Sequence, residues 1–303
     1  MKYLHYPGCS LQSTGRGYKE SMTAVFDALD VPIEELRDWN CCGATVYMSI
    51  DEHRAFALAA RNLALAEQQV NGNGGGEATH LVAPCSACYL ALTKARRYVD
   101  EYSDVKHKIA SALDSADLPF PGQVEVRHPL DIFCHDIGLP AITARVRRPL
   151  TELRVACYYG CQIIRPYADF DDQYNPTSMD RLLQALGAET VDWPLKTRCC
   201  GGSLTGTVEE VGLRLNYILL KEAIRNGANA IATACPLCQF NLECFQDRIS
   251  RRFEEQLNLP VVYFTQLMGV GFGLSERELG LKRLFVPLKL DRPETREVAH
   301  AVT

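Results

Sequence analysis

Cysteine is the residue type in this sequence with the clearest capacity for chemistry. The chain of 303 residues contains 13 cysteines, and ten of them form two sets in one order: a single residue, an adjacent pair and a Cys-x-x-Cys. The two sets are Cys9, Cys41, Cys42, Cys85 and Cys88, and Cys161, Cys199, Cys200, Cys235 and Cys238. Successive side chains of an extended strand point to opposite faces, so an adjacent pair reaches one ligand only where the backbone turns sharply. Gly43 follows the first pair, and Gly201 and Gly202 follow the second; glycine permits such a turn and lets amides approach a bound cofactor.

The make-up of each set indicates what it binds. Soft thiolates bind zinc, copper(I) or iron–sulfur clusters. A structural zinc ion takes four ligands, and five thiolates that include an adjacent pair exceed this number. An iron–sulfur cluster has several irons over which the thiolates can be distributed. We therefore expect two iron–sulfur sites, with zinc and reactive dithiols as the alternatives.

The overall composition is that of a soluble globular protein, with 47% hydrophobic and 23% charged residues. A net charge of −5 gives no reason to expect nucleic acid as a partner. No stretch is as long and apolar as a membrane span, and residues 1–7 lack the apolar region of a signal peptide. We therefore expect a cytoplasmic protein, in which thiols stay reduced and are available as ligands.

Predicted strands lead into the cysteines. Residues 79–83 and 230–234 have the pattern of buried strands that end at the two Cys-x-x-Cys motifs, and shorter strands lead to the single cysteines. Capping boxes that begin at Ser49 and Thr207, each seven residues after a cysteine pair, predict helix starts. Ligands of α/β proteins bind at the carboxyl ends of strands, where these cysteines fall.

The two cysteine sets belong to an internal repeat. Cys161 lies 152 residues after Cys9, the cysteine pair recurs after 158 residues, and the Cys-x-x-Cys recurs after 150. A glycine-rich loop around residues 71–78 lengthens the first half between its pair and its Cys-x-x-Cys. Strands alternating with helices predict an α/β fold with two similar Rossmann-like lobes. The segment from Leu281 onward lies outside the repeat and is either a docking segment or a mobile end. The predicted domains are residues 1–148 and 149–290, followed by a tail at 291–303.

Four stretches carry a resemblance to a known family: Tyr158–Gln162, Asn175–Asp180, Pro194–Ser203 and Cys235–Asn241. Together with the cysteine sets, they resemble the CCG cysteine-rich domain, and over roughly residues 1–270 the chain looks like the B-type component of heterodisulfide reductase. The resemblance implies that each set of five cysteines holds a noncubane 4Fe–4S cluster. It also implies that the two clusters are the catalytic groups and face one cleft, where a disulfide is split and each sulfur attaches to one cluster.

The same resemblance implies partners. No flavin, dinucleotide or ferredoxin-type motif is visible in the sequence, so the electrons would come from two further subunits, a small ferredoxin-like one (C-type) and a flavin-containing one (A-type). The substrate would be a small disulfide or thiol, or protein-bound sulfur if related chemistry runs in the oxidative direction. Two rival interpretations stay open: an electron-transfer subunit of a succinate, glycolate or lactate oxidoreductase, and a zinc-stapled scaffold.

Residues outside the two sets are weaker candidates. His5 and His128 occupy strand positions near the expected cleft, where each is either a proton donor to a departing thiolate or a structural hydrogen-bonding residue. Lys196 and Arg198 could offset thiolate charge, and Lys196 or Arg165 could bind an anionic substrate. Three cysteines have no repeat partner and are predicted to pack in the core: Cys134, Cys157 and Cys244.

Overall fold

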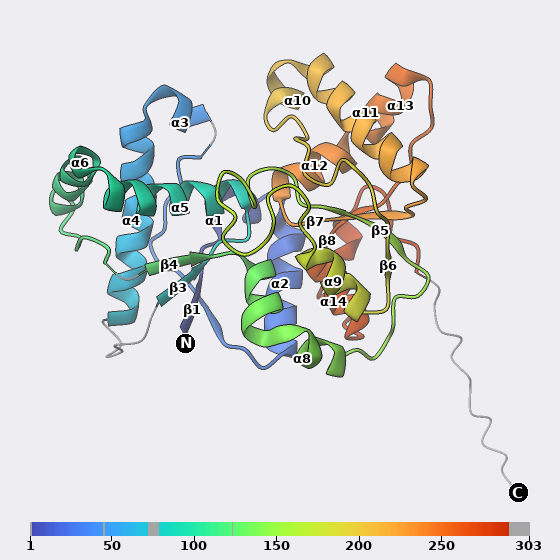
Figure 1. Ribbon diagram of the computed structural model, residues 1–303, viewed down its shortest axis with the longest axis horizontal. Helices are drawn as coiled ribbons and strands as arrows, with labels where there is room; N and C mark the ends of the chain where they lie inside the picture. The colour runs from blue at the N-terminus through green and yellow to red at the C-terminus, as the bar shows by residue number, and fades with distance from the viewer. Residues whose placement is uncertain (1, 45, 72–78, 123, 291–303) are drawn as a thin grey trace, which may run out of the picture.

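A computed structural model of the protein describes residues 2–44, 46–71, 79–122 and 124–290. Two lobes lie side by side, each built on a four-stranded parallel sheet with helices around it (Figure 1). The strand order is β2-β1-β3-β4 in the first lobe and β6-β5-β7-β8 in the second. The same order in both halves confirms the predicted α/β fold and its duplication, while the finer Rossmann likeness stays a prediction.

The first lobe alternates strands with helices. Its central strand β3 is buried along its whole length, as expected for a parallel strand covered on both faces. The elements are β1 (Lys2–His5), α1 (Gly8–Leu11), α2 (Arg16–Ala28), β2 (Ile33–Glu35), α3 (Val46–Ile50), α4 (Glu52–Asn71), β3 (Thr79–Val82), α5 (Ser86–Glu101), α6 (Ser103–Asp114), β4 (Val124–Arg127), α7 (Pro129–Asp131), the π-helix η1 (Ile132–Gly138) and α8 (Leu139–Ala144).

The second lobe repeats the scheme from β5 onward. Its central strand β7 is again buried along its whole length. The elements are β5 (Arg154–Tyr158), α9 (Ser178–Ala185), β6 (Glu189–Thr190), α10 (Leu204–Thr207), α11 (Glu209–Arg225), β7 (Ala230–Thr233), α12 (Pro236–Cys244), α13 (Gln246–Phe253), β8 (Val261–Tyr263), α14 (Phe264–Gly271) and the 3₁₀ helix η2 (Leu281–Arg283). The predicted boundary after residue 148 falls between α8 and β5, where no helix or strand is interrupted.

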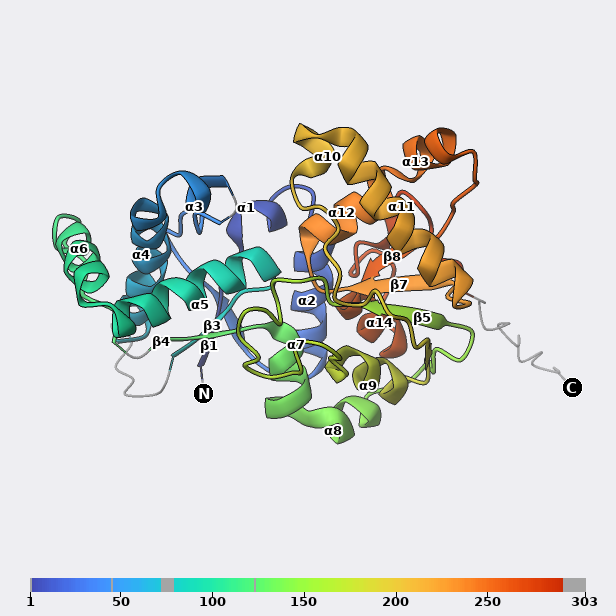
Figure 2. The same cartoon turned by 45° about the horizontal axis from the view of Figure 1, so that its top comes forward.

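The two lobes pack through a reciprocal pair of helix contacts: α2 and α14 lie in the middle of the molecule, and α8 and α9 lie in its lower part (Figure 2). α2 of the first lobe packs on α14 of the second, and the hydroxyls of Ser21 and Thr265 hydrogen-bond at 2.7 Å. In return, α7 and α8 of the first lobe pack against α9, and Cys134 Sγ of η1 lies 3.5 Å from the carbonyl oxygen of Ser178. One apolar core runs through these helices, so the lobes form a single folded unit.

Two predicted helix starts are displaced. Ser49 lies inside α3 and Thr207 ends α10, because a short helix precedes each long one. The carboxylate of Asp51 instead accepts a hydrogen bond from the amide of Arg54 at 3.1 Å and caps α4. Val208 leads into α11 without a side-chain cap. The capping pattern therefore locates both long helices but names the wrong first residue.

The chain after α14 folds back onto the protein as far as residue 290. Leu284, Leu288 and Leu290 pack against the shared core, and Val286 is buried. This part of the segment beyond Leu281 therefore belongs to the folded protein. The predicted tail at 291–303 and the glycine-rich loop at 72–78 lie outside the described residues. Among the described helices, none is long and apolar enough to cross a membrane.

Candidate metal centre

Each Cys-x-x-Cys stands at the start of a helix. Cys85 follows β3 and occupies the N-cap position of α5, and Cys235 follows β7 and occupies that of α12. Free amides and the positive end of the helix dipole gather at these positions, and both favour a thiolate. The amides of Cys88 and Cys238 hydrogen-bond the first thiol of their own motif. The carboxyl ends of the two central strands thus carry predicted ligands.

Tight turns place the adjacent pairs. Gly43, Gly201 and Gly202 have φ angles of 74°, 94° and 57°, a left-handed conformation that most other residues adopt only with strain. The turn in the second half brings the amide of Gly201 to 3.3 Å from Cys199 Sγ, and the amide of Gly202 hydrogen-bonds the thiol of Cys200. The role of these glycines in binding a cofactor stays a prediction.

The ten thiols of the two sets form one continuous array. Cys42 Sγ lies 3.2 Å from Cys88 Sγ, and Cys200 Sγ lies 3.6 Å from Cys238 Sγ. The two halves meet where the thiols of Cys85 and Cys235 hydrogen-bond, a contact that we call the junction. Each side chain contacts the next in the order Cys9, Cys41, Cys42, Cys88, Cys85, Cys235, Cys238, Cys200, Cys199 and Cys161. The order of single cysteine, pair and Cys-x-x-Cys in the first half is thus mirrored in the second half.

Burial varies along the array. The six thiols around the junction are buried. Ser86 Oγ donates a hydrogen bond to the carbonyl oxygen of Ala234 at 3.3 Å and ties the lobes together beside the junction. Each set therefore has a buried side that faces the other set and an outer side that reaches solvent. The outer thiols are the exposed Cys9, Cys41 and Cys199 and the half-buried Cys161.

Buried tyrosines and asparagines support the two pairs, and the cysteine pattern alone does not reveal them. Tyr6 donates a hydrogen bond to the carbonyl oxygen of Asn40 at 2.7 Å, and Tyr158 donates one to that of Arg198 at 2.6 Å. Both carbonyls directly precede a cysteine pair. A signal for these residues was present in the sequence, because each recurs near the offset of the repeat. The long helix after each pair also supplies one asparagine. Asn62 donates a hydrogen bond to the carbonyl oxygen of Asn40, and Asn216 donates one to that of Cys200.

Two further glycines let the chain pass directly over the Cys-x-x-Cys motifs. A β-carbon added to Gly8 would lie 3.3 Å from Cys88 Sγ, and one added to Gly160 would lie 3.2 Å from Cys238 Sγ. Carbon and sulfur atoms rarely approach so closely, since packed carbon atoms prefer about 3.5–4.0 Å. A side chain at the residue before either single cysteine would therefore press on a ligand sulfur, and the positive φ of Gly8 and Gly160 also favours glycine there.

The second half surrounds its pair with additional polar groups. Asn241 Nδ2 lies 3.4 Å from Cys200 Sγ. Hydrogen bonds from neighbouring thiols, assisted by the charge of Arg165, lower the pKa of Cys199 to about 2. Arg165 is half-buried and also donates to the carbonyl oxygen of Thr197. These groups stabilise negative charge on the thiolates of the second half.

The two other basic candidates differ in their placement. Lys196 is buried, and its Nζ lies 3.1 Å from both Asp180 Oδ1 and the carbonyl oxygen of Pro176. Its charge is therefore matched by a carboxylate rather than by the thiolates. Arg198 is exposed and next to the second pair in sequence, and its role in offsetting thiolate charge stays a prediction.

Both candidate histidines are buried and neutral. Burial lowers the pKa of His5 to about 3 and that of His128 to about 4. His128 Nδ1 accepts a hydrogen bond from the amide of Leu130 at 3.1 Å, and its Nε2 lies 3.0 Å from the carbonyl oxygen of Pro84, to which it donates. Both ring nitrogens of His128 are therefore engaged by the backbone. For His128 this geometry favours the structural alternative over proton donation, whereas Nε2 of His5 is buried without a hydrogen-bond partner among the described residues.

The three cysteines without a repeat partner lie outside the array. Cys157 is fully buried in β5, and burial raises the pKa of its thiol. Cys134 is half-buried at the contact between the lobes, and burial raises its pKa to about 12. Cys244 is half-buried at the end of α12. All three thus behave as small packing residues held in the protonated form.

The donor set fits iron–sulfur clusters better than a single metal ion. Within the described residues, no three Cys, His, Asp or Glu side chains are arranged to hold one ion. Each half instead brings five thiols together with amide donors and a helix N-terminus. Hydrogen bonds from Cys41 and Cys88 lower the pKa of Cys42 to about 4, and thiol ligands must be deprotonated to bind metal. A cluster with several irons suits such a set.

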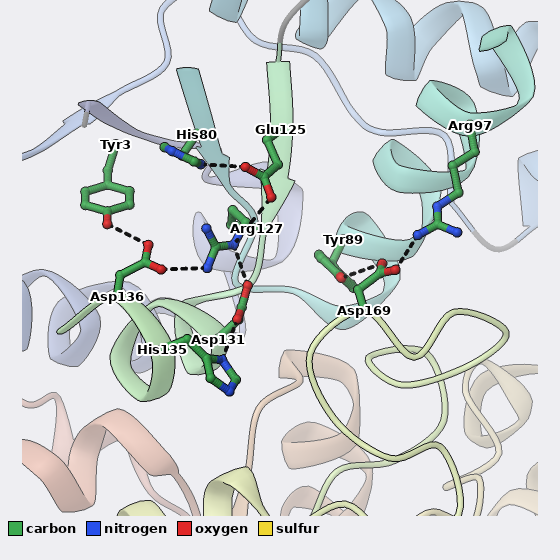
Figure 3. Close-up of polar contacts among 10 residues, drawn as sticks. All are labelled: Tyr3, His80, Tyr89, Arg97, Glu125, Arg127, Asp131, His135, Asp136 and Asp169. Atoms are coloured by element: carbon green, nitrogen blue, oxygen red, sulfur yellow. Dashed lines mark hydrogen bonds and ion pairs between the residues drawn. The ribbon is translucent and has the colours of Figure 1, made fainter. Parts of the chain in front are cut away.

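A second polar cluster lies outside the thiol array (Figure 3). Asp169 of the second lobe accepts hydrogen bonds from Tyr89 and Arg97 of the first, beside a cavity of about 650 Å³. The arginines that line this cavity are Arg96, Arg97 and Arg127, each in an ion pair with a carboxylate. We therefore assign the cluster a structural role. Around Arg127 of β4 gather Glu125, Asp131, Asp136, Tyr3, His80 and His135.

Two parallel-sheet lobes, each with five thiols at its strand ends, define a class of iron–sulfur protein built from a duplicated cysteine-rich domain. The family model for the CCG cysteine-rich domain matches the chain twice, at residues 3–93 and 155–243. The chain belongs to this family. Iron–sulfur clusters are therefore its cofactors, whereas their noncubane type rests on resemblance.

Relatives of known type resemble nearly the whole chain. It is 30% identical over 282 residues to the 8-methylmenaquinol:fumarate reductase membrane anchor subunit of Wolinella succinogenes, covering 92% of this chain and 95% of that protein. It is 27% identical over 281 residues to the B-type component of the ferredoxin:CoB-CoM heterodisulfide reductase of Methanosarcina mazei, covering 91% of each. The resemblance to the B-type component of heterodisulfide reductase is confirmed, which makes the chain an electron-transferring component of an oxidoreductase.

A solved structure shares the fold. The crystal structure of a hypothetical protein from Helicobacter pylori superposes with a TM-score of 0.74 at 14% sequence identity. The match covers 95% of this chain but 52% of the solved chain, so this protein spans about half the length of that one.

Proposed function

We propose that the protein is the catalytic subunit of a heterodisulfide reductase-like complex that reduces a disulfide at two noncubane 4Fe–4S clusters. When bound, the clusters supply single electrons from two adjacent sites. The reverse, oxidative chemistry on a thiol or persulfide would use the same residues. One cluster would be held by Cys9, Cys41, Cys42, Cys85 and Cys88, and the other by Cys161, Cys199, Cys200, Cys235 and Cys238.

The continuous thiol array is the observation that carries this proposal. The buried sides of the two sets meet at the junction, while the outer thiols reach solvent. The two sulfur atoms of a disulfide are about 2 Å apart, so both can be served only by sites that face each other closely. A pair of clusters that merely relayed electrons would not need to meet.

The protein's own groups would control charge and substrate binding. Amides at Gly201 and Gly202 and the side chain of Asn241 stabilise negative charge at the second pair. Gly43 turns the chain equivalently at the first pair. Arg165, next to Cys199, is placed to bind an acidic group of a thiol-containing substrate. We expect these contacts to hold the acidic group of a small disulfide near the outer thiols, with the two sulfur atoms of the disulfide toward the junction.

Electrons would enter through other subunits of a cytoplasmic complex. We propose that the immediate donor is ferredoxin-like (C-type) and that a flavin-containing (A-type) partner supplies it in turn. The exposed thiols Cys9, Cys41 and Cys199 mark the surface where an iron–sulfur donor could approach within electron-transfer distance.

The decisive experiment is spectroscopic. The protein is purified without oxygen and oxidised with and without candidate thiols, and its electron paramagnetic resonance spectrum is recorded. We expect a paramagnetic signal that appears only with thiol and is lost in Cys42→Ser and Cys200→Ser, but kept in Cys244→Ser, which lies outside the array. A spectrum indifferent to every thiol would overturn disulfide catalysis, and zinc without acid-labile sulfide would overturn the clusters.

A second candidate function is supported by the similarity to the fumarate reductase component, which extends over 95% of that relative. In this alternative, the two clusters pass electrons between partner subunits of a succinate-, glycolate- or lactate-type oxidoreductase and no disulfide binds. Such a relay predicts reduction and reoxidation of both clusters by partner subunits, at rates unaffected by added thiols. Stopped-flow absorbance with and without thiol distinguishes the two functions.

A further inference from the structure

A buried carboxyl group lies on the helix that carries the second Cys-x-x-Cys. Glu243 of α12 is 2% exposed, and its Oε1 accepts a hydrogen bond from the amide of Val286 at 3.2 Å. Its other oxygen accepts from Gln239 Nε2. Among the described residues, no basic side chain forms an ion pair with it. Burial raises the pKa of Glu243 to about 8, so this carboxyl carries its proton at neutral pH.

A chain of side chains runs from Glu243 toward the thiols. Gln239 Oε1 accepts a hydrogen bond from Tyr263 Oη at 3.4 Å. The ring of Tyr263 stacks on that of Tyr18, with centroids 4.4 Å apart and planes 9° from parallel. Burial raises the pKa of both tyrosines, and the nearby thiols of Cys85 and Cys235 add to this effect. The chain therefore extends from an uncharged acid toward the place where the two cysteine sets meet.

A small cavity gives this chain access to solvent. It has a volume of about 150 Å³ and is lined by Glu243, Gln239 and Tyr263. Arg283 and the 67%-exposed Phe285 also line it and lie at the surface. One water needs roughly 15 Å³ of such space and a few polar partners. The cavity that Glu243 and Tyr263 both line therefore has room for several waters, which offer a proton a route that does not cross the amide of Gln239.

The neighbouring charged groups do not compete for the proton. Arg283, which lines the cavity, is paired with Glu20 of α2 at 2.7 Å. From the described part of the C-terminal segment, the amides of Phe285 and Val286 hydrogen-bond Glu243. Burial raises the pKa of Tyr263 far above neutrality, so this hydroxyl passes a proton on but does not ionise. The thiol of Cys244, next in sequence, stays protonated because burial raises its pKa.

We propose that Glu243 and Tyr263 deliver protons from this cavity to the junction during disulfide reduction, with Gln239 as a positioning residue. This inference rests on the proposed function. In the balanced reaction, R–S–S–R′ takes up two electrons and two protons, the S–S bond breaks, and one RSH and one R′SH leave. The electrons come from an iron–sulfur donor protein, and the protons come from water through the cavity.

The test compares two matched pairs of substitutions in the cluster-loaded complex. Glu243→Gln removes the acid and still lets an oxygen accept from Val286, and Tyr263→Phe removes the hydroxyl and keeps the stacked ring. The controls are Glu255→Gln and Tyr217→Phe, which break an exposed carboxylate–tyrosine bond of 2.7 Å elsewhere in the lobe. We expect each buried change to lower kcat for disulfide reduction by at least about tenfold, and each control to leave it unchanged.

The pH profile adds a readout that a structural role would not change. In the wild-type complex, kcat falls as the pH rises through about 8, because Glu243 then loses the proton that it donates. Glu243→Gln abolishes this descending limb. Infrared difference spectra should show a protonated carboxyl that titrates in the same range and is missing in the variant, independently of turnover.

The outcomes separate the two claims. Wild-type turnover that is indifferent to both buried changes, with iron content intact, would overturn the proton route and leave the proposed function standing. Absence of turnover with every disulfide in a wild-type complex with full clusters would overturn the proposed function and this inference with it. Reduced turnover in Glu243→Gln with an unchanged pH profile would assign Glu243 a structural role only.

Discussion

The two cysteine sets have the same thiols in the same order, yet their surroundings differ. At the second pair, Asn241 donates to Cys200 Sγ at 3.4 Å, whereas Ala91 stands at the equivalent place in the first half. Arg165 lies beside the second set, and its counterpart in the first half is Ser13. Hydrogen bonds to sulfur and nearby positive charge raise the reduction potential of a cluster. We therefore expect the second-half cluster to be reduced first.

This difference shows how a duplicated site can perform two roles. Two identical clusters would compete for the same electron, whereas two unequal ones are reduced in a fixed order. The duplication supplies the shared frame of thiols, glycines and tyrosines, and substitutions around one pair supply the asymmetry. The experiments below either remove the cluster of one cysteine set or change how the surroundings of the two sets differ.

The largest effect is expected from removing a ligand of one half. Cys42→Ser in the first set or Cys200→Ser in the second removes a buried thiol at the centre of its set, and we expect each variant to lose one cluster, or about half of its iron. Iron and acid-labile sulfide analysis measures this loss. Cys244→Ser is the control. Full iron content in either ligand variant would show that the two sets do not hold separate clusters.

A large effect on stability is expected at Lys196, which is buried in an ion pair with Asp180 at 3.1 Å. Its first-half counterpart is Asp38, an exposed partner of Arg61. Lys196→Met leaves a buried carboxylate unpaired, so the free energy of unfolding should fall by about 3–5 kcal/mol, as measured by anaerobic urea denaturation. Lys221→Met, which breaks an exposed pair, serves as the control and should change little. Equal effects of the two substitutions would contradict the assignment.

A moderate and symmetrical effect is expected at Gly8 and Gly160. Gly8→Ala and Gly160→Ala each press a β-carbon onto a ligand sulfur at 3.3 Å or 3.2 Å and place alanine at positive φ. We expect each to cost roughly 1–2 kcal/mol of stability and to loosen the cluster of its own half, as judged by the rate of iron release to a chelator. Gly206→Ala, with nothing within 4 Å of the new β-carbon, is the control. Iron release from the wrong half would argue against the assigned sets.

The smallest effect is expected from Asn241→Ala. Losing one hydrogen bond to a thiolate should lower the potential of the second-half cluster by about 60 mV, the equivalent of roughly 1.4 kcal/mol for one electron. Redox titration followed by electron paramagnetic resonance measures the shift. Thr205→Val removes only a neighbouring bond to Asn241 Oδ1 and should shift the potential less. A potential that stays fixed in Asn241→Ala would remove the main support for unequal clusters.

Much of the fold could be predicted because the chain repeats itself. The strand at 79–83 and its copy at 230–234 are β3 and β7, and the α/β class follows from their alternation with helices. Helix starts at Ser49 and Thr207 were wrong, since a capping pattern cannot show that a short helix precedes the long one. The packing of Leu284 and Leu288 on the core could not be predicted either, because the internal repeat gives no information about segments that lack a copy.

The candidate site, too, could be predicted only in part. Spacing indicates the ten thiols but not their order in space, because the junction depends on how the two lobes pack. Lys196 was a candidate to offset thiolate charge or to bind an anionic substrate, and nothing in its sequence neighbourhood reveals that Asp180 would pair with it. Glu243 gave no signal either, since a glutamate on a helix is ordinarily exposed and only the path of the C-terminal segment buries it.

The reciprocal helix contacts have a consequence for the origin of the protein. α2 packs on α14 and α7 and α8 pack on α9, so each half gives the other an equivalent surface, as the subunits of a two-fold symmetric dimer do. A single-lobed ancestor that paired with its own copy would already have formed the junction. Gene fusion of two such copies would then have released the halves from the requirement of identical sequence. Asn241 in the second half and Ala91 at the equivalent position in the first half are an example of such divergence.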